Sequence, residues 1–417
     1  MIINKWIIIF ICMWFSWPLI NYKLGVLPFL IILAIWFVTT DYRWFFNKLS
    51  LDLVVLFIWI LTFLPYILTR NFQYGAVDGK YAMITFTVFM VGLLINHYFM
   101  YYNKNPIILG RIALFIILFY FIGSIQTYFG LKVYPLAARA LATGNDPLQL
   151  TYHSLGIGGF GFVYSAVFIN IVILYFFIKK EENLPNIYKY LCLVVYLGIS
   201  IMLISASYAT SLLLLFAGTL LVFIIRGKRS LIIGIVLAIF IILLLPKEVI
   251  GYFLIDIARL FETNEVIRSK FLDFAQGFVS ESIGSQTSTR GQLYLVSLET
   301  FLKNPLFGIY GPFGNAFNAQ VGGHSGWFDL LAYYGLFGSL PLFAVIFLNF
   351  RKQLKFYSNH SYYRILLIAQ ILFIMFGFIN PVMYIYQMGF VIFAVAPAIP
   401  FLPNAFSKKG NEKVTLL

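Results

Sequence analysis

The chain has 417 residues, of which 61% are hydrophobic and only 11% are charged, and its formal net charge is +14. A soluble globular domain carries about 25% charged residues, so a chain of this length with so few charges cannot cover a water-exposed surface. The composition therefore excludes a soluble enzyme and predicts a polytopic protein of the lipid bilayer, a solvent that accepts apolar surface.

The apolar segments, taken in chain order, predict an all-α fold with about twelve transmembrane helices, because each approaches the roughly 20 apolar residues that a spanning helix needs. The first segment is interpreted as a membrane helix and not as a signal peptide, since no small-residue cleavage site follows it. We expect one membrane domain over 1–417. The expected spans are residues 5–20, 24–40, 51–68, 81–100, 106–128, 154–178, 188–205, 208–225, 230–246, 325–349, 363–379 and 382–402.

The distribution of the 29 basic residues predicts the orientation of these spans. When the segments alternate from a cytoplasmic N-terminus, most basic residues fall on the cytoplasmic side, including the runs at 226–229 and 351–355. An even number of helices then places both termini in the cytoplasm. Because the charge sits in short loops and forms no basic stripe with interleaved aromatic residues, we expect no nucleic-acid partner.

Two of the predicted external loops are long, at about residues 129–153 and 247–324. Loops of that length inside a compact protein are uncommon unless they have a function. The larger loop has partial helical periodicity, for example at Ile267, Phe271, Phe274 and Phe278. We expect it to contain short helices that lie at or near the membrane interface.

Cations in these external loops are informative because topology does not require them there. Arg290 follows Thr287 and Ser288, either of which could be an N-cap, so we expect Arg290 in the first turn of a helix. The positive end of that helix would then add to an anion site. Arg139 lies in the other long loop. Each arginine has an alternative role as an interfacial side chain that reaches lipid headgroups.

Histidine is the residue whose ordinary pKa allows it to act as an acid or a base near neutrality. His97 and His360 fall on the predicted cytoplasmic side and are interpreted as structural. His153 is external and its role stays open. His324 is external, follows the glycines at 322–323 and opens the tenth predicted helix, so it is a candidate general base.

Asp329 lies five residues after His324. At about 100° per residue the two side chains would not share a helix face unless His324 precedes the helix. Asp329 is therefore either a partner of His324 or an intramembrane acid with another partner. The two cysteines, Cys12 and Cys192, lie inside apolar segments, and no residue spacing is typical of a metal site, so we expect neither a disulfide nor a metal.

One stretch resembles a known family. It contains Ser-Thr-Arg290, then Asn304-Pro-Leu-Phe-Gly308, then His324-Ser-Gly, and ends in Gly335-Leu-Phe-Gly338. This order resembles the signature of the O-antigen ligase and Wzy-type polymerase superfamily over roughly 50 residues. The family usually has Asn after the histidine, where this chain has Ser325. The ligases often carry a Ser-Arg pair where this chain reads Ser-Tyr at 207–208, which favours the polymerases.

The resemblance implies a GT-C-like helical fold and a membrane glycosyltransferase of the bacterial cytoplasmic membrane that needs no metal or cofactor. Such an enzyme joins a glycan carried on undecaprenyl diphosphate to a second lipid-linked glycan at the outer face. As a hypothesis, His324 is the base and Arg290 stabilises the diphosphate leaving group. Arg139, Asp329 and His153 are candidate substrate-binding residues. Expected partners are the lipid-linked donor and acceptor, membrane lipids and a chain-length regulator.

Two alternatives stay open. A ligase would use the same chemistry but move the finished glycan to a different acceptor. A lipid-linked sugar transporter would need charged residues within the membrane and broken helices in paired positions. The expected spans are nearly free of charge, which disfavours the transporter.

Overall fold

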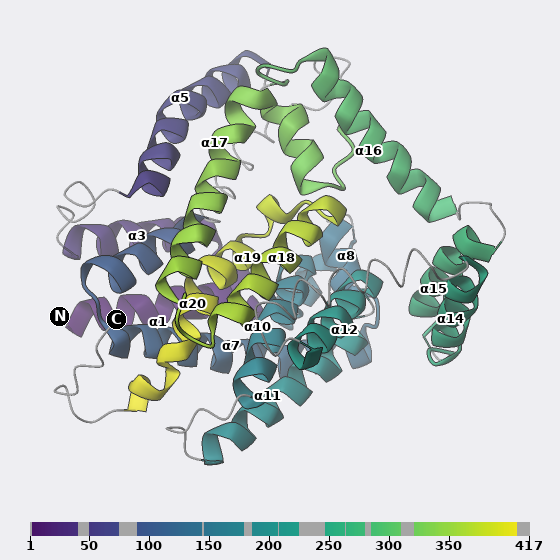
Figure 1. Ribbon diagram of the computed structural model, residues 1–417, viewed down its shortest axis with the longest axis horizontal. Helices are drawn as coiled ribbons and strands as arrows, with labels where there is room; N and C mark the ends of the chain where they lie inside the picture. The colour runs from purple at the N-terminus through teal and green to yellow at the C-terminus, as the bar shows by residue number, and fades with distance from the viewer. Residues whose placement is uncertain are drawn as a thin grey trace.

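The computed structural model describes residues 2–40, 50–74, 90–143, 146–178, 186–206, 208–224, 247–262, 264–279, 285–309 and 321–406. Every regular element in these ranges is a helix, so the all-α prediction is confirmed for them. Figure 1 shows a bundle of helices with one helical hairpin set apart from it.

The first half of the described chain forms helices of very different lengths. They are α1 (Ile2–Ser16), α2 (Pro18–Leu24), α3 (Val26–Thr39), α5 (Leu51–Tyr74), the π-helix η1 (His97–Tyr102), α7 (Pro106–Val133), α8 (Ala137–Thr143), α9 (Gln149–Ser154), α10 (Phe160–Ile178), α11 (Asn186–Ser205) and α12 (Ala209–Ile224).

The second half begins with helices from the predicted long loop and ends with short helical pieces. They are α14 (Lys247–Arg259), α15 (Glu265–Val279), α16 (Ser285–Lys303), α17 (Gly326–Phe356), α18 (Tyr363–Ile379), η3 (Val382–Tyr384), α19 (Tyr386–Phe390), η4 (Val391–Val395), α20 (Ala396–Ala398) and η5 (Ile399–Phe406).

Four stretches of helix in the described ranges are long and apolar enough to cross a membrane, and one bent pair of helices would make a fifth. The four cover residues 106–133, 160–178, 326–356 and 386–405. These lengths fit the predicted membrane protein. The expected total of about twelve spans stays a prediction, since several apolar helices are shorter than the roughly 20 residues a span needs. The expected span 230–246 lies outside the described residues.

The first expected span, residues 5–20, is wrong as a single helix. Trp17 has an extended backbone, with φ −119° and ψ 105°, and Pro18 begins a new helix. A residue that precedes proline avoids the helical conformation, which explains the break at this position. The axes of α1 and α2 differ by 102° as a result.

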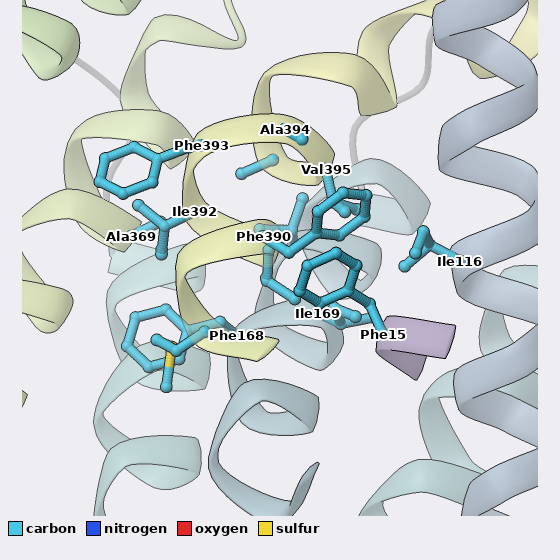
Figure 2. Close-up of a cluster of buried hydrophobic side chains, with 14 of the residues drawn as sticks. Phe15, Ile116, Phe168, Ile169, Ala369, Phe390, Ile392, Phe393, Ala394 and Val395 are labelled. Atoms are coloured by element: carbon cyan, nitrogen blue, oxygen red, sulfur yellow. The ribbon is translucent and has the colours of Figure 1, made fainter. Parts of the chain in front are cut away.

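The core of the bundle surrounds α10. All side chains from Phe162 to Phe176 are buried, which explains why this helix is apolar on every side. Figure 2 shows Phe168 and Ile169 of this helix together with side chains from α1, α7, α18 and the segment 390–395. Phe15 of α1 stacks on Phe390, with ring centroids 4.1 Å apart. The C-terminal helical pieces therefore run through the middle of the molecule.

The expected span 325–349 falls within α17, a helix of spanning length, but α17 consists of two helices that meet at Gly335. This glycine has φ 59°, in the left-handed region that interrupts a helix. The Ser339 hydroxyl donates to the carbonyl oxygen of Leu330 at 2.8 Å, so the chain folds back at the kink. Figure 1 shows the two halves of α17 at a sharp angle.

The backbone groups that the kink releases find partners in the loop after α16. The amides of Leu336 and Phe337 donate to the carbonyl oxygens of Pro305 and Leu306 at 2.8 and 3.0 Å. In return, the amide of Ile309 donates to the carbonyl oxygen of Ala332 at 3.0 Å. Broken helices are tolerated in membrane proteins where the freed groups are satisfied in this way.

The predicted short helices within 247–324 are present in its described part. α14 and α15 form a hairpin around Ala258, Ile267 and Phe271, and Leu212 of α12 packs against this small core. In Figure 1 the hairpin lies at the right, and α16 connects it with the region of the α17 kink.

A buried polar network joins the first helices to the last part of α17. The Asp52 carboxylate is 2% exposed and lies 3.7 Å from the Nζ of Lys352. Asn349 donates to the same carboxylate at 3.2 Å. The Nζ of Lys352 also lies 2.9 Å from the Nδ1 of His97 on η1. His97, which the sequence assigned a structural role, therefore contacts the buried ion pair.

Candidate functional site

The candidate base His324 lies in a short turn that precedes α17. The turn covers residues 321–325, and Gly323 has φ 70°, a conformation that favours glycine. Ser325 is the N-cap of α17 and accepts a hydrogen bond from the amide of Phe328 at 3.4 Å. Because α17 begins at Gly326, His324 lies outside the helix that it was expected to open. Its side chain is half-buried.

The carboxylate of Asp329 holds this turn in place. It is 1% exposed and accepts hydrogen bonds from the amides of Gly323 at 3.3 Å and Ser325 at 3.1 Å. These two residues flank His324 on both sides. The structure therefore brings His324 and Asp329 into one unit, in which the carboxylate fixes the backbone that carries the imidazole. Hydrogen bonds to an ionised acceptor are stronger than those between neutral groups, so a carboxylate can hold the backbone of the turn firmly.

Ser297 on α16 completes the unit and was not identified from the sequence. Its hydroxyl donates to Asp329 Oδ1 at 2.6 Å and accepts from the amide of Gly322 at 2.9 Å. A hydroxyl has one proton and two lone pairs, so it can link these two groups at once. A serine in an amphipathic helix is not distinctive, and its neighbours Asp329 and Gly322 are distant in sequence.

The main chain of α16 lies close against the same turn. A Cβ added to Gly322 would lie 2.1 Å from the carbonyl oxygen of Leu293, so only glycine fits there. Residues seven apart return to nearly the same face of a helix. By sequence spacing alone, position 290 is therefore in register with position 297 along α16.

The expected position of Arg290 in a first helical turn is wrong. α16 begins at Ser285, so neither Thr287 nor Ser288 caps it. The positive end of the helix therefore does not lie at Arg290, and any anion site there depends on the side chain. The side chain of Arg290 lies outside the described residues.

The first residue of α17 contacts the break between α18 and α19. The amide of Gly326 donates to the carbonyl oxygen of Asn380 at 2.9 Å. The side-chain nitrogen of Asn380 is buried and has no hydrogen-bond partner within the described residues. An unpaired buried donor is rare, so this amide is a further polar group available beside the turn.

Arg139 and His153, the second group of predicted residues, lie on the neighbouring helices α8 and α9. The guanidinium of Arg139 lies over the ring of Tyr208, 5.9 Å from its centroid, and the Tyr208 hydroxyl donates to the carbonyl oxygen of Ala138 at 2.6 Å. His153 stacks on Tyr22 with ring centroids 4.0 Å apart. Burial lowers the pKa of His153 from its usual 6.5, so the ring is favoured in its neutral form.

A cavity of about 300 Å³ is lined by neighbours of residues from both groups. Its wall includes Tyr22, on which His153 stacks, and Leu141, which belongs to α8 together with Arg139. The wall also includes Pro381. Pro381 follows Asn380, whose carbonyl oxygen accepts the hydrogen bond from the amide of Gly326. The His324 turn and the residues Arg139 and His153 are thus each next to a segment that lines this cavity.

Within the described ranges, no group of three or more His, Cys, Asp or Glu side chains is placed to hold a metal ion. Cys12 and Cys192 are both buried as free thiols.

No model of a protein family matches the chain, and no curated protein is significantly similar to it in sequence.

Proposed function

We propose that this chain is a membrane glycosyltransferase, a polysaccharide polymerase that acts on O-antigen or capsule repeat units. It transfers a glycan from undecaprenyl diphosphate to the non-reducing end of another lipid-linked repeat unit. The observation that carries the proposal is the Asp329-held turn with His324, packed against the helix that carries Arg290. Two further parts of the resembling motif, residues 304–308 and 335–338, also contact each other, through Gly308 and Gly335 among others.

The proposed reaction is a single displacement at the anomeric carbon of the donor. The acceptor hydroxyl oxygen forms a bond to that carbon while the bond from the carbon to the diphosphate oxygen breaks. The proton of the hydroxyl passes to the imidazole of His324. The electron pair of the broken bond leaves on the diphosphate, and cationic side chains stabilise the negative charge that develops. Arg290 has this role in the proposal, and Arg139 is the second candidate.

The proposed setting is the bacterial cytoplasmic membrane, with both termini in the cytoplasm and the His324 turn facing the periplasm or exterior. The finer proposal is a GT-C-like fold with about twelve spans, each of roughly 20 residues. Proposed partners are the lipid-linked donor and acceptor, membrane lipids and a chain-length regulator. Helices long enough to span a bilayer support the membrane setting.

The test is a polymerisation assay with the purified protein in membranes and lipid-linked repeat units as the only substrate. We expect the wild-type protein to form a ladder of chains. The rate of chain formation by His324→Ala should be lower by at least about 100-fold, the usual contribution of a general base. His360→Ala is the matched control, because His360 is exposed and its Nδ1 accepts a local bond from the amide of Tyr362.

Arg290→Ala should also lose chain formation. Arg290→Lys separates two explanations, since lysine keeps the charge but not the forked geometry that grips a phosphate. Near wild-type chain formation by folded His324→Ala and Arg290→Ala would overturn the assignment. Transfer to a different acceptor without a ladder would make the chain a ligase, and flipping of the lipid-linked sugar without chain growth would make it a transporter.

A further inference from the structure

The cavity of about 300 Å³ has walls contributed by Leu141 of α8 and by three longer segments. They are the end of α1 with α2, the first turn of α10, and residues 381–387. Phe15, Phe160 and Phe162 provide aromatic surface. Tyr22, Phe160 and Gln387 are only half-buried, so the cavity reaches the surface of the molecule. Its volume is at the lower end of the roughly 300–1,000 Å³ of small-molecule sites.

Two polar groups in the wall have hydrogen-bonding capacity left over. The side-chain amide of Gln387 forms no hydrogen bond with other residues in the part of the chain that the structure describes. The Tyr22 hydroxyl accepts from the amide of Gly159 at 3.2 Å, and its own proton has no acceptor among those residues. Buried or half-buried polar groups usually find partners, so both are available to a ligand.

Gly161 makes room for Gln387. A Cβ at this position would lie 2.5 Å from the Oε1 of Gln387, so a larger residue would displace the amide from the cavity. Next to Gln387, the Tyr386 hydroxyl donates to Asn21 Oδ1 at 2.8 Å, which fixes that part of the wall. The cavity is thus shaped by close packing around its polar groups.

The chemistry of the wall selects the class of ligand. None of the lining residues that the structure describes is charged, so this part of the wall offers no cation for a phosphate. An acyl chain would leave the Gln387 amide and the Tyr22 hydroxyl without partners, which costs free energy. A sugar ring satisfies both requirements, because its C–H faces pack on aromatic rings and its hydroxyls donate and accept hydrogen bonds.

We propose that this cavity binds a neutral sugar ring of the glycan substrate, an inference that rests on the proposed polymerase function. The ring would then lie between the segment that contacts the His324 turn and the helix that carries Arg139. Gln387 and Tyr22 are the residues that recognise its hydroxyls.

The experiment measures binding separately from catalysis. The probe is the free oligosaccharide released by mild acid from the lipid-linked pool of cells that lack this chain. Its binding to the purified full-length protein in lipid nanodiscs is measured by titration calorimetry. Chain formation is measured in parallel with the intact lipid-linked substrate.

Three variants act on the cavity in different ways. Gln387→Met removes the amide at constant volume, Tyr22→Phe removes the hydroxyl but keeps the ring on which His153 stacks, and Gly161→Ala displaces Gln387. Each is expected to weaken binding by about tenfold, the loss of one good hydrogen bond. Gln276→Met on the distant α15 is the matched control and should bind as the wild type does. His324→Ala should bind normally while chain formation fails.

Wild-type binding and chain formation by all three cavity variants would overturn the sugar site and leave the polymerase proposal intact. A bound phospholipid that the oligosaccharide does not displace would also overturn it. If the wild type forms no chains yet binds the oligosaccharide, and the cavity variants lose that binding, the site stands and the polymerase function fails.

Discussion

At the scale of single residues, Asp329 does more for His324 than its place in the sequence indicates. Its carboxylate bonds the amides on both sides of the histidine and the hydroxyl of Ser297. The backbone of the turn is therefore fixed by a group that lies on the following helix. We regard Asp329 and Ser297 as positioning residues, since they act through the His324 turn.

Asp329→Asn should lower chain formation by about 10- to 100-fold, because an amide accepts with one oxygen only and the turn would shift. The measurement is the rate of chain growth per folded protein, with size-exclusion profiles to show that the variant folds. Asp256→Asn is the control, since that exposed carboxylate pairs with Arg259 on the same helix and with no other residue that the structure describes. Unchanged activity of Asp329→Asn would show that the turn does not need the carboxylate.

His153 gives a prediction for the pH dependence of stability. Because burial lowers its pKa, the folded chain binds this proton less well than the unfolded chain. The contribution to stability is complete above the usual value of 6.5 and decreases as the pH falls through it. His153→Phe keeps the stacking on Tyr22 and removes the titration, so its Tm should fall less between about pH 7.5 and about pH 5.5. We expect a difference of about 1–3 °C in thermal melts. An equal fall in Tm for the wild type and His153→Phe would show that His153 is not the source of the pH dependence.

At the scale of elements, two glycines decide the path of the chain around the site. Gly308 and Gly335 both have positive φ, and a Cβ on Gly335 would lie 2.5 Å from the amide nitrogen of Gly308. The loop after α16 and the kink of α17 therefore meet backbone to backbone. This contact fixes the angle of the half-helix that begins at the His324 turn.

Gly335→Ala should reduce the yield of folded protein strongly, because the added methyl meets rigid backbone and the left-handed conformation is strained. Gly25→Ala is the matched control: Gly25 has φ 63° but nothing within 4 Å of the added Cβ. The control should cost only the conformational strain of about 1–3 kcal/mol. Size-exclusion chromatography of membrane extracts provides the measurement, and equal yields of the two variants would contradict the close contact.

At the scale of the whole molecule, the network around Asp52 connects distant parts of the chain. Asp52 on α5 contacts Lys352 and Asn349 on α17, and Lys352 contacts His97 on η1. Trp59 of α5 also donates to the carbonyl oxygen of Gly338 at 2.8 Å, just after the kink. The helix that begins near the site is thus anchored to the N-terminal helices along its length.

Removal of one partner should cost more than removal of both. Lys352→Met leaves the buried Asp52 carboxylate without its cation, and we expect a loss of about 3–5 kcal/mol. The double variant Asp52→Asn with Lys352→Met should recover most of this loss, since no unpaired charge remains. The measurement is a double-mutant cycle of unfolding free energies or apparent Tm in detergent. Additive losses would show that the two groups do not interact.

The sequence by itself determined the helical class and the membrane character, because composition and run length alone decide which solvent a segment tolerates. It also identified His324 and Asp329 as unusual residues, because a titratable side chain stands out in an apolar segment. The order of the motif parts was visible as well, but their contact was not.

Only the tertiary structure decided which groups meet. The breaks at Trp17 and Gly335, the role of Asp329 and the link through Ser297 depend on hydrogen bonds between residues distant in sequence. The cavity likewise arises from four segments whose polar groups look ordinary one at a time. Hydrophobic periodicity reports the solvent that a helix faces, whereas a site depends on which backbone and side-chain groups the packing leaves in contact.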